Sequence, residues 1–179
     1  MVIDLGNVNT SATFVKTNSD KYISMSRYND PKLSKYRVLK DDLVMVMTDR
    51  KSTMDLLGKT GKIYQEGLYL LNQRMYRIRA KNNINVNYLY AVLNSSETSA
   101  ALKEKALGSV QKYVNTGDIN ELLIKIPSIS EMNEIASIID PIMQMIENNT
   151  LENNNLVALR DALLPKLMSG ELDVSDIDL

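Results

Sequence analysis

Two Gly-Lys pairs, Gly58-Lys59 and Gly61-Lys62, are the residues whose type and spacing come closest to a known chemical site. Glycine-rich loops that carry a lysine hold nucleotide phosphates when the spacing is Gly-x4-Gly-Lys-Ser/Thr. That spacing is absent from this chain. Nucleotide binding is therefore not expected.

Carboxylate pairs offer a second kind of chemistry. Asp41 and Asp42 are adjacent, and the chain ends in the acidic stretch DVSDIDL. Neighbouring side chains of a strand point to opposite faces, and a terminal stretch of this kind is expected to fray. We therefore expect no metal site.

The chain contains no histidine and no cysteine. Disulfides, thiolate metal sites and cysteine nucleophiles are thereby excluded, together with every arrangement that needs an imidazole base. This argues against most hydrolase mechanisms. Carboxylate or lysine chemistry stays open.

Charge divides the chain into two parts. Residues 1–129 hold 19 basic and 12 acidic side chains, a net charge of +7, whereas residues 130–179 hold 2 and 10, a net charge of −8. Such a division suggests two parts with different partners. The basic part could face phosphates, although an ordinary solvated surface also explains the excess.

Hydrophobic residues make up 44% of the 179 residues, which permits a real core. No basic-plus-apolar leader opens the chain, and no apolar run approaches the roughly 20 residues that span a bilayer. We expect a soluble, cytoplasmic protein.

Short strands are predicted for most of the first 80 residues. The stretches that indicate them are VIDLGNV, SATFVKT, KYISM, the two apolar runs of YRVLKDDLVMVMTD, KTGKIYQEG and LYLLNQRMYRIRA. Asp41-Asp42 would form a hairpin turn, and the residues from Arg74 onward alternate as a strand with one wet face does. An antiparallel or mixed sheet follows.

Two short helices and one more strand complete the first part. NVNYLYAVLNS and SSETSAALKEKALG have helical spacing, with Ser96 as the expected cap and Gly108 as the stop. GSVQKYVNTGD is expected to be a polar loop, and ELLIKIP a strand that Pro127 ends. The fold class predicted is α+β, with a first domain over residues 1–129.

Residues 130–170 follow a three-four apolar rhythm from a start near Ser130. The stripe expected to form an interface consists of Ile138, Ile142, Met145, Leu156, Leu159, Leu163 and Leu167. We favour one long helix of about 37 residues, roughly 55 Å long, although Pro141 could kink it or begin a second helix. An acidic tail, residues 171–179, would follow.

The apolar stripe needs another helix to cover it. Since only one such helix is expected in the chain, a second polypeptide is the favoured partner. The alternative is a helical hairpin that turns near Asn148-Asn149 or Asn153–Asn155 and packs on itself.

The C-terminal part carries an ordered set of positions. They are Ile126-Pro127, Glu131, Ile135-Ala136, Asp140, Leu159, Leu163-Leu164 and Ser169-Gly170-Glu171-Leu172. In this order they resemble the spacer helix of the DNA specificity subunits of type I restriction-modification systems. Met132-Asn133 stands where that family usually has glutamine, and Pro141 is unusual.

Upstream stretches resemble the landmarks of the same family's target recognition domain. They are YISMSRYND, YRVLKDDLVMVMT, LLNQRMYRIRA and GSVQKYVNTGDINELLIKIP, with Asp41-Asp42 where the family usually has Gly-Asp. The family's fuller form resembles this chain doubled, and its leading segment is short or missing here. A half-length subunit is expected, whether naturally split, rearranged or truncated.

The resemblance implies that residues 1–129 bind double-stranded DNA and recognise a short half-site. Lysine and arginine would neutralise phosphates, and Arg, Asn and Gln would bond base edges. The candidate contacts are Lys21, Tyr22, Arg27, Tyr28, Arg50, Lys51, Lys59, Lys62, Asn72, Gln73, Arg74, Ser109, Gln111, Lys112 and Tyr113. Tyrosines in the core, or amides that satisfy the backbone, would explain the same residues without DNA.

The resemblance also implies partners. The chain itself would be no enzyme and would need no cofactor, since methyltransferase subunits would carry S-adenosylmethionine and a restriction subunit could join them. The helix would join two half subunits as a homodimer or hold a second half subunit. The alternatives are a non-DNA assembly protein, an inactive remnant that acts only through its helix, and a histidine-free carboxylate enzyme.

Overall fold

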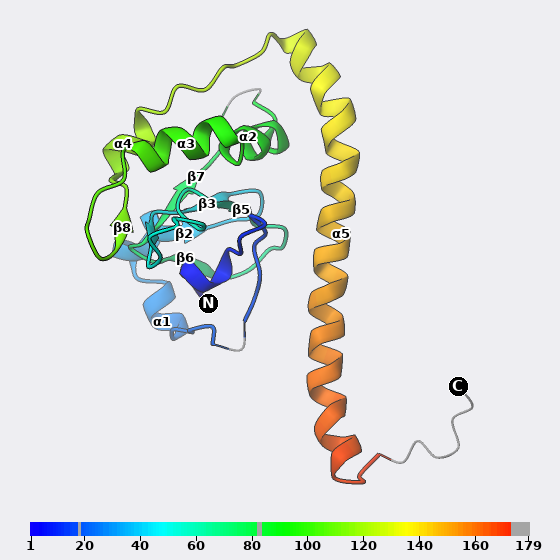
Figure 1. Ribbon diagram of the computed structural model, residues 1–179. Coiled ribbons are helices and arrows are strands. Elements are labelled where there is room, and N and C mark those ends of the chain that lie inside the picture. The colour runs from blue at the N-terminus through cyan, green and yellow to red at the C-terminus, as the bar shows by residue number, and fades with distance from the viewer. Residues whose placement is uncertain (18, 82–83, 173–179) are drawn as a thin grey trace. The chain divides into compact units, whose positions relative to one another are not determined.

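The computed structural model describes residues 1–17, 19–81 and 84–172. The chain divides into two compact units, Met1–Pro141 and Ile142–Leu179. The first unit holds short strands and helices, and the helix α5, Ile129–Met168, begins in it and continues through the second (Figure 1). The α+β class with a long C-terminal helix is confirmed. Most of the predicted acidic tail, residues 173–179, lies outside the described residues.

Within the described residues, the strands of the first unit form three small sheets. The first sheet has the order β1-β6-β2, where β1 is Val2–Ile3, β6 is Tyr69–Leu71 and β2 is Arg37–Val38. β1 runs parallel to β6, with Val2 opposite Leu70, and β2 runs antiparallel to it.

The other two sheets are antiparallel. One has the order β5-β3-β7, with β5 Thr60–Lys62, β3 Leu43–Val46 and β7 Met75–Ile78. The last pairs β4, Thr48–Asp49, with β8, Lys112–Tyr113.

Strand β3 is buried on both faces, which explains why its sequence is an unbroken apolar run. Val44 and Val46 belong to one hydrophobic cluster, which also contains Phe14 and Ile63. Leu43, Met45 and the following Met47 belong to a second cluster, which the short helices cover. The first unit is thus built around one central strand.

The two predicted short helices are confirmed as α2, Val86–Leu93, and α3, Ser96–Glu104. They bury Leu89, Leu93 and Leu102 in the second cluster. The cap of α3 is Ser95 and not Ser96, because the Ser95 hydroxyl accepts a hydrogen bond from the amide of Thr98. Two shorter helices are α1, Met25–Tyr28, and α4, Thr116–Asn120.

Two short stretches of 3₁₀ helix are η1, Leu5–Asn7, and η2, Pro31–Tyr36. The predicted strand KYISM is therefore wrong beyond an isolated bridge between Lys21 and Val2, since Ser24 caps α1. The predicted loop GSVQKYVNTGD contains β8 and the start of α4.

The predicted strand ELLIKIP is also wrong. Leu122 and Ile124 pack on the second cluster and Leu123 is 99% exposed, as an extended segment would require. No described strand pairs with this segment, because the neighbouring chain is α2, whose Tyr88 hydroxyl donates to the carbonyl of Lys125.

The turn at Asp41-Asp42 is present, and Asp41 has a left-handed φ of 65°. It joins β2 to β3, which belong to different sheets, so the predicted hairpin is wrong. The Asp42 carboxylate is buried, accepts the amide of Leu39 at 2.8 Å, and receives two hydrogen bonds from Arg79 at 2.5 and 2.7 Å. These bonds fix the corner between the two sheets.

Helix α5 continues without a break through Pro141 and through the asparagine-rich middle. A proline inside a helix removes one backbone hydrogen bond, and here that loss does not end the helix. The hairpin alternative is therefore wrong. The helix starts earlier than predicted, because Ser128 and Glu131 exchange the two hydrogen bonds of a capping box. These bonds lower the pKa of Glu131.

Asp140 anchors the early part of α5 inside the first unit. Its carboxylate accepts hydrogen bonds from the side-chain amides of Asn85, at 3.1 Å, and Asn87, at 2.8 Å. Asn85 also caps α2, because its side-chain oxygen accepts the amides of Asn87 and Tyr88.

Within the described residues, no helix is both long and apolar enough to cross a membrane.

Replacing Asp42 by alanine should lower the free energy of unfolding by about 2–3 kcal/mol, because the Leu39 amide and the half-exposed Arg79 lose their acceptor. Urea denaturation followed by circular dichroism measures this loss. Asp55→Ala, at an exposed carboxylate bonded to Thr53, is the matched control and should cost under about 0.5 kcal/mol. Equal losses in the two variants would contradict the role assigned to Asp42.

Candidate nucleic-acid interface

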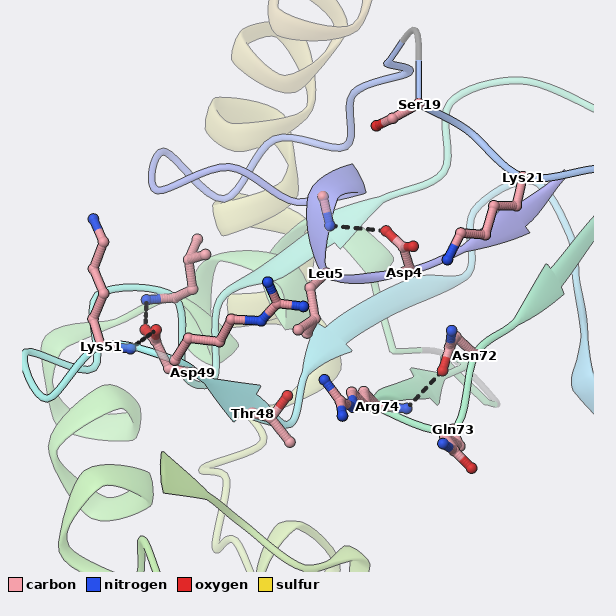
Figure 2. A pocket seen from close by; sticks show the side chains of 13 residues that line it. Asp4, Leu5, Ser19, Lys21, Thr48, Asp49, Lys51, Asn72, Gln73 and Arg74 are labelled. Atoms are coloured by element: carbon pink, nitrogen blue, oxygen red, sulfur yellow. Dashed lines mark hydrogen bonds between the residues drawn. The ribbon is translucent and has the colours of Figure 1, made fainter. Parts of the chain in front are cut away.

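A hollow of about 640 Å³ opens where several strands of the first unit end (Figure 2). Its wall combines three separate parts of the chain, residues 4–6, 48–51 and 72–74, with three single residues. The lining residues are Asp4, Leu5, Gly6, Ser19, Lys21, Thr48, Asp49, Arg50, Lys51, Leu56, Asn72, Gln73 and Arg74.

The parallel pairing of β1 with β6 brings two of these parts together. Since parallel strands end at the same edge, residues 4–6 and 72–74 leave the sheet side by side. The Asn72 amide donates to the carbonyl of Ile3 at 3.0 Å. The bridge between Val2 and Lys21 adds Lys21 to the same edge.

The third part, residues 48–51, joins through β3. The amide of Met47, which follows β3, donates to the carbonyl of Arg74 at 3.0 Å, so that β4 begins beside the turn at residues 72–74. In that turn the side-chain oxygen of Asn72 accepts the Arg74 amide at 3.3 Å, and its backbone carbonyl accepts the Met75 amide at 3.0 Å.

Asp49 organises the loop that carries Arg50 and Lys51. Its carboxylate is buried and accepts the amides of Lys51 at 2.9 Å and Leu56 at 2.7 Å. Figure 2 shows both hydrogen bonds. Because the buried charge is satisfied by backbone amides, the neighbouring side chains of Arg50 and Lys51 stay exposed to solvent.

The hollow has an excess of positive charge. Among the described residues that line it, Lys21, Arg50, Lys51 and Arg74 are cationic, and two aspartates are acidic. Asp49 bonds the loop amides, and Asp4 accepts the amide of Gly6 at 3.0 Å. The carboxylates thus bond backbone groups and leave the cations without an anionic partner among the described residues.

Three arginines elsewhere in the first unit are engaged. Arg79 bonds Asp42, Arg77 donates to the carbonyl of Arg37, and Arg37 donates to the carbonyl of Tyr28 at 3.0 Å. Within the described part of the chain, the guanidinium groups of Arg50 and Arg74 make no such bond. The fold therefore ties Arg37, Arg77 and Arg79, whereas both arginines that line the hollow have free guanidinium groups within the described residues.

Six of the predicted contact residues meet in this hollow. They are Lys21, Arg50, Lys51, Asn72, Gln73 and Arg74. Their separation in the sequence gave no sign that they would meet.

The predicted segment 109–113 lies one strand away. In the β4–β8 ladder Lys112 is opposite Asp49 and Tyr113 is opposite Thr48. Ser109 and Tyr113 are exposed, whereas Gln111 and Lys112 are half-buried. The segment therefore adjoins the wall from which the loop of Arg50 and Lys51 projects.

Three other candidates lie around a second, smaller hollow or near it. Tyr22 and Tyr28 line this hollow, which has a volume of about 420 Å³. Tyr22 is exposed, whereas Tyr28 is buried with the guanidinium of Arg37 4.9 Å from its ring centroid. Arg27 is exposed on α1.

Lys59 and Lys62 are placed differently from the other candidates. Lys62 is buried, lies 3.2 Å from Asp41 and donates to the side chain of Asn87 at 2.9 Å. Lys59, just before β5, is half-buried. Lys62 thus has a structural role in linking β5 to α2.

The other residues that line the hollow were not predicted. They are Asp4, Leu5, Gly6, Ser19, Thr48, Asp49 and Leu56. Their side chains carry no signal of their own in the sequence. Only the knowledge that β1 and β6 run parallel would have placed residues 4–6 there. Within the described residues, no group of three or more His, Cys, Asp or Glu could hold a metal ion.

The first unit is thus a small α+β fold that carries a cationic hollow with side-chain amides, and the chemistry of this hollow suits a polyanion. The family comparison makes this specific. The family model of the type I restriction modification DNA specificity domain matches residues 3–158. The chain belongs to this family.

Two curated relatives are similar to parts of the chain. The type I restriction enzyme MjaIX specificity subunit of Methanocaldococcus jannaschii is 36% identical over 70 residues, which are 39% of this chain and 16% of that protein. The type I restriction enzyme HindI specificity subunit of Haemophilus influenzae is 28% identical over 102 residues, which are 56% of this chain and 22% of that protein. The matches thus span less than a quarter of either relative.

Replacing Asp49 by alanine should release the loop from Lys51 to Leu56, because two backbone amides lose their acceptor. In hydrogen exchange, the amides of Lys51 and Leu56 should lose protection while those of β3 keep it. Asp49→Asn, which retains one acceptor oxygen, should lose less protection. If both amides stay protected in the alanine variant, the carboxylate does not hold the loop.

Proposed function

We propose that residues 1–129 recognise a DNA half-site in a type I restriction-modification system. The observation that carries this proposal is the convergence of Lys21, Arg50, Lys51 and Arg74 on one hollow. Cations that lack internal partners suit phosphates, whose neutralisation releases bound counterions. The side-chain amides of the same hollow suit base edges. Family membership supports the same conclusion.

The contacts divide into two kinds. Arg50 and Lys51 are exposed on the loop that follows Asp49. They would bind phosphates and position the duplex. Residues 72–74, held at a strand end, would reach base edges. Segment 109–113, which β8 attaches to the same wall, would extend the contact along the duplex.

Helix α5 would join two such chains. Its predicted stripe is mostly exposed, and only Leu163 is half-buried. The exposed apolar residues are Ile138, Ile142, Met145, Leu156, Leu159 and Leu167. In water an exposed apolar stripe of this kind favours a second helix. A second chain of the same kind would provide that helix, either as the other copy of a homodimer or as a different half subunit.

The positions of the apolar stripe are symmetric along the sequence about the bond between Thr150 and Leu151. Two antiparallel copies that cross there match in three pairs, which are Ile138 with Leu163, Ile142 with Leu159, and Met145 with Leu156. Asn149 then lies opposite Glu152 at the polar middle. Polar residues on such a seam fix register and orientation, so the antiparallel homodimer is favoured.

In this arrangement α5 would set the distance between two half-sites. Its 40 residues extend over roughly 60 Å. Methyltransferase subunits, which would carry S-adenosylmethionine, and a restriction subunit would dock on the assembled dimer. This chain would supply recognition and no catalysis.

Removing the two loop cations should weaken duplex binding. For the Arg50→Ala/Lys51→Ala chain we expect the slope of log affinity against log salt to fall by about 2, because two phosphate contacts are lost. Fluorescence anisotropy of a labelled duplex across salt concentrations, with and without the methyltransferase, measures this.

Lys32→Ala/Lys35→Ala is the control for that experiment, since it removes the same charge from η2, outside the lining of the hollow. It should leave the slope nearly unchanged. Equal effects of the two pairs would mean that only net charge matters. No duplex affinity at any salt would favour an assembly protein that does not bind DNA.

The helix register is tested by cysteine cross-linking, because the chain has no cysteine of its own. Mixed Met145→Cys and Leu156→Cys chains should form a disulfide between copies, whereas neither variant alone should do so. Non-reducing electrophoresis gives the answer. Cross-linking of Met145→Cys with itself would indicate parallel helices and contradict the proposal.

The Leu159→Glu/Leu163→Glu variant controls for collisions without pairing. Added to the mixed cysteine chains, these charges should abolish the cross-link and give particles of single-chain mass in light scattering. A dimer that persists in this variant would place the interface elsewhere.

A further inference from the structure

We infer that Arg74 is the residue that distinguishes bases in the hollow, and that it recognises a guanine in the major groove. This inference rests on the proposed function, since it requires a duplex at the hollow. It goes further in naming one residue and one base.

The backbone of Arg74 is fixed on both sides. Its amide donates to the side chain of Asn72 at 3.3 Å, and its carbonyl accepts the amide of Met47 at 3.0 Å. The next residue, Met75, is buried and begins β7. Base recognition needs groups held on rigid elements, and these bonds fix Arg74 in a tight turn directly before β7.

The guanidinium of Arg74 makes no hydrogen bond within the described part of the chain, although the next two arginines in the sequence do. Arg77 and Arg79, on and just after the same strand, bond the carbonyl of Arg37 and the carboxylate of Asp42. Figure 2 shows the Arg74 side chain extending from the turn toward Thr48. Of the three arginines from 74 to 79, only this one lines the hollow.

The two neighbouring amides are less suited to this task. Asn72 would bond adenine through its oxygen and its nitrogen together, but the Arg74 amide already takes one lone pair of that oxygen and holds the side chain against the turn. Gln73 is exposed, and no bond within the described residues orients its side chain. Asn72 is therefore a positioning residue for Arg74.

An arginine fork donates two parallel hydrogen bonds to N7 and O6 of guanine, which no other base presents together. Lysine keeps the charge but cannot reproduce the fork. A change from arginine to lysine therefore separates base recognition from attraction to phosphates.

The test starts from duplexes that the full chain selects from a random pool at low salt. For the wild-type chain, 7-deazaguanine at one shared guanine should weaken binding roughly 5- to 150-fold. For Arg74→Lys, the same replacement should weaken binding much less, because an ammonium lacks the fork, while the salt dependence of binding stays that of the wild type. Arg50→Lys, the same change at a phosphate contact, should retain the guanine preference.

The inference is overturned if the selected duplexes share no guanine, or if the deazaguanine effect in Arg74→Lys is as large as in the wild type. It is also overturned if Arg50→Lys loses the preference and Arg74→Lys keeps it. In these cases duplex binding itself remains, so the proposed function stands. A wild-type chain that selects no duplex would instead refute the proposed function, and this inference with it.

Discussion

The parallel pairing of β1 with β6 is the constraint on which the candidate site depends. Two short strands from distant parts of the chain, joined at Val2–Leu70 and Ile3–Leu71, end at one edge of a sheet. Parallel strands require a long connection between them, and here that connection contains most of the remaining sheet structure. Without this pair, residues 4–6 and 72–74 would not meet, and the hollow would lose two of its walls.

The second constraint is the burial of β3 on both faces. Val44 and Val46 pack on one side, whereas Leu43 and Met45 pack on the other, so the strand cannot shift register without exposing one set. The bond between Met47 and Arg74 passes this rigidity to the site. The carboxylates of Asp42 and Asp49 then complete the scaffold, one through Arg79 and the other through loop amides.

Sequence patterns predicted the elements better than their partners. Helices α2, α3 and α5 were predicted because their apolar spacing is local, and six residues of the hollow were identified by their chemical type. The hairpin at Asp41-Asp42 and the strand ELLIKIP were wrong because strand pairing depends on distant chain. Lys59 and Lys62 looked alike beside their glycines, yet only the fold shows that Lys62 pairs with Asp41 inside the domain. The position of Asp49 beneath the loop is likewise a product of tertiary structure.

The fold ties Arg37, Arg77, Arg79 and Lys62 to internal partners, whereas Lys21, Arg50, Lys51 and Arg74 meet at one hollow, where we propose that DNA binds. Hydrogen–deuterium exchange of the full chain, with and without a selected duplex, tests this separation most directly. We predict slower exchange in residues 4–6, 48–56 and 72–74 when DNA is bound, with α2 and α3 unchanged. Protection confined to α2, α3 or α5, with the hollow exchanging as in the free chain, would contradict the account.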